Sequence, residues 1–211
     1  MPFPSRRNYG RRKPYRLAKK IHILCEGDKE VDYFRFFAEM DSRLDVRVIP
    51  PDQDNSPTGL LNKAKNIYAA LKRKGEFRKI DEIWLVFDND TYKNPHRIEQ
   101  IKTVYDEAAR MENWFTAQSH PCFEVWLYYH GAERPPASAG MEHCATWKQT
   151  ILPKVFPGGF DNRKHPALLG NAIENARKNF CKTPDGLCPG STEVFRLGER
   201  IFGFVKNYLS E

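Results

Sequence analysis

Four short apolar segments, separated by amphipathic stretches, constrain the fold of this chain most. The apolar segments are residues 21–25, 46–49, 82–87 and 114–118. The stretches between them, 28–40, 59–74 and 95–113, carry apolar residues at helical spacing. Continuous apolar strands that alternate with such helices are typical of a parallel sheet covered on both faces. The sequence therefore predicts an α/β fold with a mostly parallel four-stranded sheet.

The second part of the chain has a different pattern. A loop rich in proline and glycine, residues 131–140, is followed by three predicted helices near 141–152, 165–180 and 192–209. We therefore expect three regions. They are a flexible basic tail (1–19), an α/β domain (20–130) and a helical C-terminal elaboration packed on it (131–211).

Basic residues are concentrated at the N-terminus. The first 20 residues hold eight lysines and arginines and no acid, whereas the rest of the chain holds 26 basic and 27 acidic side chains. Such an arm suits a polyanion such as nucleic acid, and a merely solubilising extension is an equal alternative. The predicted nucleic-acid contacts of the arm are Arg6, Arg7, Arg11, Arg12, Lys13 and Arg16.

Composition excludes several classes of protein. A hydrophobic fraction of 40%, with 14 Phe, 9 Tyr and 4 Trp, is too high for a wholly disordered chain. Mean hydropathy is −0.67, and no apolar run approaches the ~18 residues of a membrane span. The basic start lacks the apolar stretch of a secretory signal. Five cysteines without a C-x-x-C pair suggest a reducing compartment, so we expect a cytoplasmic protein without a membrane partner.

Carboxylates follow two of the apolar segments. Glu26 comes directly after the first segment, and Asp88 and Asp90 come after the third. Ligands of parallel sheets collect beyond the carboxyl ends of the strands, and Glu30 lies one helical turn beyond Glu26. Such carboxylates repel one another unless a cation lies between them. Hard oxygen ligands favour Mg²⁺ or Mn²⁺, so this edge of the sheet is a candidate metal site.

Each motif also has a simpler interpretation. An isolated Glu-Gly or D-x-D sequence is more often a turn than a metal site. Response-regulator receivers and haloacid-dehalogenase phosphatases also gather acids on such sheets, and for them an aspartate would be phosphorylated. Receivers, however, place an acidic pair after the first strand, and the phosphatases place their D-x-D there. Here Glu-Gly comes first and D-x-D follows the third strand.

The order of these motifs resembles the Toprim catalytic domain of topoisomerases, primases and overcoming-lysogenization-defect nucleases. The segments that carry this resemblance are I-L-C-E-G-D-K-E at 23–30 and V-F-D-N-D at 86–90. Three further segments resemble the RloB family, a small Toprim-like group encoded in bacterial restriction and phage-defence loci. They are C-E-G-D-K-E-V-D-Y-F at 25–34, S-H-P-C-F-E-V-W-L at 119–127 and P-G-S-T-E-V-F-R-L at 189–197.

The resemblance implies Mg²⁺- or Mn²⁺-dependent cleavage of DNA or of RNA such as tRNA, in anti-phage defence or restriction. Glu26 would be a general base or acid and a metal ligand, and Asp88 and Asp90 would bind metal. Glu30 and Glu124 are further predicted ligands, although Glu124 equally suits the start of a helix with a buried apolar face.

Two expectations concern binding partners. Lys29 could contact a phosphate, with a solvated surface role as the alternative. The chain has no G-x-x-x-x-G-K-[ST] motif, so we expect no ATPase activity of its own. The resemblance to the RloB family implies an ATPase from the same locus as a protein partner. A different class of function stays open, namely a non-catalytic subunit that binds nucleic acid or a partner and keeps a structural metal.

Overall fold

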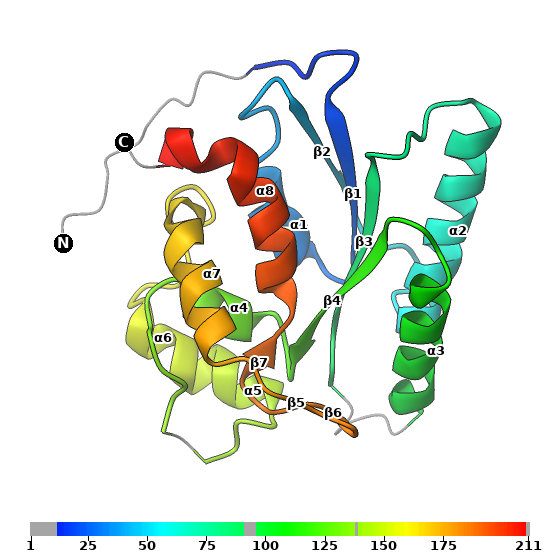
Figure 1. The fold of residues 1–211 in the computed structure, drawn as a ribbon. Coiled ribbons are helices and arrows are strands. Elements are labelled where there is room, and N and C mark those ends of the chain that lie inside the picture. Colours follow the sequence, from blue (N-terminus) through cyan, green and yellow to red (C-terminus); the bar gives the residue numbers. More distant parts are fainter. Residues whose placement is uncertain (1–11, 91–95, 138, 210–211) are drawn as a thin grey trace.

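The computed structural model describes residues 12–90, 96–137 and 139–209, and its centre is a five-stranded sheet with helices on both faces (Figure 1). The strand order is β2-β1-β3-β4-β7. The four strands β1 to β4 are parallel, and β7 is antiparallel to β4. Their bounds are β1 Lys19–Cys25, β2 Leu44–Ile49, β3 Glu82–Asp88, β4 Trp114–His120 and β7 Ser191–Thr192.

The four predicted strands and their parallel direction are confirmed, but the predicted number of strands is wrong. The fifth strand, β7, pairs Thr192 with Ser119 and Ser191 with His120. Two residues are too few to show a period of two along the sequence. The last helix, predicted over 192–209, therefore begins two residues later, at Val194.

Three helices connect the parallel strands. They are α1 Asp28–Arg35, α2 Pro57–Arg73 and α3 Arg97–Ala109. The N-cap of α2 is Ser56, whose side chain accepts a hydrogen bond from the Gly59 N–H. The first helix is shorter than the predicted 28–40. Its chain leaves the helical conformation before Glu39, which has a left-handed φ of 60°.

The C-terminal part is built from helices and one small hairpin. The predicted segment 141–152 is divided into three short helical pieces, and 165–180 begins as a 3-10 turn. The elements are α4 Glu124–Tyr128, α5 Cys144–Thr146, the π-helix η1 Trp147–Ile151, α6 Leu152–Val155, the 3-10 helix η2 His165–Leu168, α7 Leu169–Lys178, strands β5 Lys182–Thr183 and β6 Gly186–Leu187, and α8 Val194–Leu209.

The sheet separates two apolar clusters, because successive strand residues face opposite sides. On one side Leu24, Leu85 and Phe87 belong to a cluster with residues of α2 and α3. On the other side Ile23 and Val86 belong to a larger cluster with residues of α1, α4, α7 and α8. Figure 1 shows the same division, with α2 and α3 on one side of the sheet and α1 and α8 on the other. The C-terminal helices thus cover a face of the sheet.

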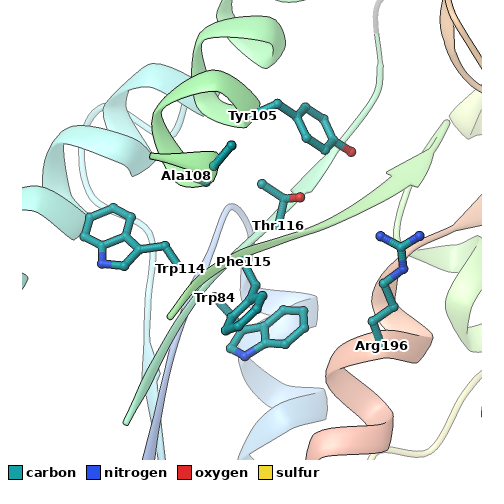
Figure 2. A pocket seen from close by; sticks show the side chains of 8 residues that line it. Trp84, Tyr105, Ala108, Trp114, Phe115, Thr116 and Arg196 are labelled. Carbon is teal, nitrogen blue, oxygen red and sulfur yellow. The ribbon is translucent and has the colours of Figure 1, made fainter. Parts of the chain in front are cut away.

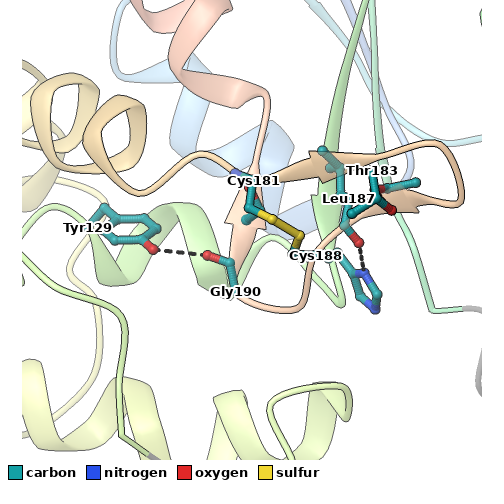
Figure 3. Close-up of a disulfide and its surroundings, with 9 residues drawn as sticks. Tyr129, Cys181, Thr183, Leu187, Cys188 and Gly190 are labelled. Carbon is teal, nitrogen blue, oxygen red and sulfur yellow. Dashed lines mark hydrogen bonds between the residues drawn. A yellow bond between two sulfur atoms is a disulfide. The ribbon is translucent and has the colours of Figure 1, made fainter.

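Two cysteines form a disulfide, which the sequence analysis did not expect. Cys181 and Cys188 are joined at the base of the β5–β6 hairpin (Figure 3), with their Cα atoms 5.4 Å apart. The hairpin turn explains this proximity, since it folds the two residues back onto each other. Cys25, Cys122 and Cys144 are free and buried. Among the described residues, no helix combines the length and the apolar character needed to cross a membrane.

Candidate active site

A pocket of about 300 Å³ lies beyond the carboxyl ends of β1 and β3 and is lined by five acidic residues. The sequence analysis singled out four of them as metal ligands, which are Glu26, Glu30, Asp88 and Glu124; the fifth is Asp28. The lining residues are Glu26, Gly27, Asp28, Lys29, Glu30, Asn55, Asp88, Phe123, Glu124 and Lys148. The fold therefore places residues from five separate parts of the sequence around one space, as expected for ligand sites of parallel sheets.

Glu26 is held at the junction of two strands. Its Oε2 accepts a hydrogen bond of 2.9 Å from the Asp88 N–H. The guanidinium of Arg97 donates to both carboxylate oxygens, at 2.6 Å to Oε1 and 2.5 Å to Oε2. Arg97 also donates to the Asp88 carbonyl oxygen, at 2.8 Å from Nη2 and 3.1 Å from Nε. Arg97 therefore balances the charge of Glu26 and fixes its orientation.

The sequence analysis missed Arg97. It is the first residue of α3, and a segment whose placement is not described separates it from the D-x-D motif. The only signal in the sequence was its position at the start of the helix that follows the third strand. Arginines are common at such positions without having a role in a functional site, so the sequence did not mark Arg97 as a site residue.

Glu30 is buried against the glycine turn that follows β1. A Cβ atom on Gly27 would lie only 2.8 Å from the Glu30 Oε2, so glycine lets this carboxyl group approach the backbone. Burial raises the pKa of Glu30 to about 7, and the negative charges of Glu26 and Glu124 add to the increase, while a hydrogen bond from its own backbone N–H opposes it.

Asp88 is the last residue of β3 and experiences the same repulsion. Burial raises the pKa of its carboxyl group well above the usual range, and the nearby charges of Glu30, Glu26 and Glu124 raise it further. Without a cation, the pocket therefore favours protonated carboxyl groups. A bound divalent ion would neutralise the same carboxylates, so they would no longer need protons to reduce their mutual repulsion.

Glu124 lies on the opposite wall, as the first residue of α4. Its carboxylate is nearly inaccessible, with 1% of the residue exposed. The ammonium of Lys29 lies 2.5 Å from its Oε1, and that of Lys148 lies 3.9 Å away. Both predicted placements of Glu124 are therefore found together, at a helix start and in the acidic pocket. Lys29 lies at the pocket, where it pairs with Glu124.

In the structure, the predicted catalytic residues Glu26, Asp88 and Asp90 do not form a group of three ligand atoms within 4.8 Å of one another. Asp90 lies two residues beyond β3 and is not among the described residues that line the pocket. Among the described residues, the one group of three potential ligands with all donor atoms within 4.8 Å is Cys122, Glu124 and Cys144. The joint metal binding of Glu26, Asp88 and Asp90 therefore stays a prediction.

The basic arm is described only in its last part. Arg6, Arg7 and Arg11 lie outside the described residues. The Arg12 N–H donates to the Glu39 carbonyl oxygen at 2.7 Å, and its guanidinium lies 5.2 Å from the centre of the Tyr208 ring. Lys13 and Arg16 are exposed. The described end of the arm, at Arg12, thus lies beside α8.

A second pocket, of about 190 Å³, lies between β4, α3 and α8 (Figure 2). The rings of Trp84 and Phe115 are stacked there with centroids 4.8 Å apart. Tyr105 donates a hydrogen bond of 2.6 Å to the Glu193 Oε2. Its lining is mainly aromatic and contains one arginine, Arg196. No carboxylate is among the residues that line this pocket.

Comparison with known proteins gives one result. The family model described as RloB-like protein matches residues 21–201, a span that includes every strand of the central sheet except the start of β1. No curated protein and no solved structure matches the chain. Because the family model covers most of the chain, this protein belongs to the RloB-like family.

Proposed function

We propose that this protein is a metal-dependent nuclease of the Toprim type, which hydrolyses phosphodiester bonds in DNA or RNA. The observation that carries the proposal is the convergence of Glu26, Glu30, Asp88 and Glu124 on one pocket at the carboxyl edge of the sheet. The resemblance of the segments around Glu26 and Asp88 to the Toprim motifs supports it.

The donor set suits Mg²⁺ or Mn²⁺. Carboxylate oxygens are hard ligands, which these ions prefer, and the repulsion at Asp88 and Glu30 is of the kind that a bound cation relieves. Glu26, Asp88 and Glu30 would hold the ion. When bound, it would polarise the phosphate and lower the pKa of a bound water.

The protein's own side chains divide the remaining tasks. Arg97 keeps Glu26 in place at the end of β1. Without a bound ion the pKa of Glu30 is about 7, so binding of the ion near neutral pH would release a proton from this carboxyl group. Lys29 and Lys148 border the pocket and are each about half exposed, so their ammonium groups can approach the phosphates of a substrate.

The biological role is part of the same proposal. A nuclease in anti-phage defence or restriction, acting on DNA or on RNA such as tRNA, follows from the family resemblance. The same resemblance implies a separate ATPase as the partner that regulates the nuclease. A cytoplasmic location, where such substrates are found, belongs to the proposal as well.

One observation favours a second candidate, a non-catalytic subunit that binds nucleic acid or a partner protein and keeps a structural metal. Two of the four carboxylates already have a basic partner, since Glu26 pairs with Arg97 and Glu124 pairs with Lys29. Such a protein would gain thermal stability from Mg²⁺ without cleaving any nucleic acid.

The test is a cleavage assay with Mg²⁺ or Mn²⁺ on total tRNA, plasmid and single-stranded DNA. We expect Glu26→Gln and Asp88→Asn each to reduce cleavage by at least about 100-fold, as expected for loss of an acid–base or metal-binding group. The matched control is Glu174→Gln, on the exposed surface of α7, which should cleave normally. Full activity in both pocket variants, or activity that is indifferent to EDTA, would refute the proposal.

A further inference from the structure

A second group of potential ligands lies beside the acidic pocket. The sulfur atoms of Cys122 and Cys144 and a carboxylate oxygen of Glu124 all lie within 4.8 Å of one another. Cys122 lies in the turn between β4 and α4, Glu124 is the first residue of α4, and Cys144 is the first residue of α5. All three are buried, with exposed fractions of 0%, 1% and 8% for Cys122, Glu124 and Cys144.

The spacing of these atoms is close to that of a tetrahedral zinc site. Zn–S distances of about 2.3 Å and Zn–O distances of about 2.1 Å place ligand atoms roughly 3.5 to 3.8 Å apart in a tetrahedron. The distances between the ligand atoms therefore need to shorten by at most about 1.3 Å around an ion. Thiolates select zinc over magnesium because they are soft ligands.

The surrounding charges also suit a zinc ion. Two thiolates and one carboxylate carry three negative charges, so Zn²⁺ leaves a single negative charge. The ammonium groups of Lys29 and Lys148, at 2.5 Å and 3.9 Å from Glu124, lie where they can balance it. Burial of these charged groups without such balance would lower the free energy of unfolding.

The other cysteines of the chain do not share this setting. Cys181 and Cys188 are joined to each other. Cys25 is fully buried in β1, and its sulfur lies 3.9 Å from the Ile23 carbonyl oxygen. Cys25 belongs to none of the three-ligand groups in the described part of the chain. Cys25 is therefore an internal control for thiol burial alone.

We propose that Cys122, Glu124 and Cys144 bind one Zn²⁺ ion, with solvent in the fourth position. Each thiol gives its proton to solvent as its sulfur binds the ion. The ion joins α5 to the turn before α4 at the border of the acidic pocket. In this assignment Glu124 serves zinc, and Glu26, Glu30 and Asp88 remain for the proposed nuclease site.

The experiment uses the full chain, purified in the presence of a phosphine reductant. Because the reductant also opens the Cys181–Cys188 disulfide, a Cys181→Ser/Cys188→Ser variant is a control, and it should bind zinc as the wild type does. Metal content is measured after gel filtration, and the zinc is then replaced with Co²⁺ for absorption spectroscopy. We expect one zinc per chain and a thiolate-to-cobalt charge-transfer band, which carboxylate ligands alone cannot produce. Cys144→Ser should weaken zinc binding by more than about 100-fold, beyond the usual effect of losing an outer-shell partner. Cys25→Ala should keep both signals.

Glu124→Gln is the second variant, because it keeps both thiols. We expect it to weaken zinc binding while the cobalt complex retains thiolate bands, and thermal melts confirm that each variant is folded. The proposal is overturned if the reduced wild-type chain retains no zinc, if the cobalt complex lacks the charge-transfer band, or if folded Cys144→Ser binds zinc as the wild type does. A Cys122–Cys144 disulfide in place of bound zinc also overturns it. Asp88→Asn should keep its zinc, so the nuclease and zinc proposals can fail separately.

Discussion

Arg97 shows how a single residue determines the chemistry that its neighbours can perform. Its guanidinium contacts both oxygens of Glu26 and the main chain of Asp88. An arginine held in this way fixes the orientation of a carboxylate. Glu30 has a different setting, in which burial raises the pKa of its carboxyl group and the positive charge of Lys148 opposes part of the increase. The chain thus positions Glu26 with a paired arginine, whereas Glu30 is buried beside other carboxylates.

The raised pKa of Glu30 makes a prediction about stability. Its pKa is about 7 in the folded chain, against an ordinary value of 4.5. Between these values the folded chain binds more protons than the unfolded chain, so the free energy of unfolding falls as pH rises. In the presence of EDTA, we expect the free energy of unfolding of the wild type to fall by up to about 3 kcal/mol more than that of Glu30→Gln between pH 4.5 and 7. Urea unfolding at several pH values measures it.

Asp88 contributes a decrease of the same sign, because its pKa is also raised. Some pH dependence should therefore remain in the Glu30→Gln variant. Glu174→Gln is the control, because Glu174 lies on the exposed surface of α7 and pairs with Lys178. Equal slopes for Glu30→Gln and the wild type would contradict the assignment of the pH dependence to Glu30.

The sequence predicted which carboxylates meet, because each follows an apolar strand and the strand ends of a parallel sheet lie at one edge. It could not predict how they are paired. Arg97 and Lys148 come from segments whose positions depend on the packing of whole helices. The separation of Asp90 from the pocket lining likewise depends on the path of the chain after β3.

At the scale of elements, α8 depends on a close contact with α7 and α4. A Cβ atom on Gly198 would lie 3.1 Å from Ile173, 3.3 Å from Leu169 and 3.3 Å from Trp126. Gly203, on the same helix, is exposed and has nothing within 4 Å of such an atom. One helix therefore offers a matched pair of glycines.

Alanine at these two positions should have opposite effects on stability. We expect Gly203→Ala to raise the free energy of unfolding by about 1 kcal/mol, because alanine favours the helix. We expect Gly198→Ala to lower it by about 1 kcal/mol or more, because overpacking of the buried contact exceeds the helical gain. Chemical denaturation of both variants measures the difference, and stabilisation by Gly198→Ala would show that α7 can move away at little cost.

The success of element prediction followed the length of each element. The strands β1 to β4 have six or seven residues, which is long enough to form a recognisable apolar run. The pieces α5, η1 and α6 have three to five residues each. Helices of that length are held by tertiary packing rather than by their own propensity. The local pattern therefore could not show where the helical type changes between these three consecutive pieces.

At the scale of the whole molecule, the sheet is covered on its larger apolar face by residues from the end of the chain. Ile173 of α7, and Leu197 and Ile201 of α8, belong to the same buried cluster as Ile23 and Val86 of the sheet. The fifth strand, β7, also comes from this region. The boundary that we predicted at residue 130 therefore crosses one continuous core.

This arrangement predicts that residues 1–130 do not fold on their own. Without α7 and α8, the apolar face with Ile23, Trp84 and Val86 would be exposed to water, and burial of such side chains is the main source of folding free energy. We expect the truncated chain to lack a cooperative thermal transition and to bind a hydrophobic dye. The control is a chain that lacks residues 1–11, which should melt cooperatively, because the described core remains complete. A cooperative transition in the 1–130 chain would show instead that the first four strands and their helices are an independent folding unit, to which the C-terminal helices are only attached.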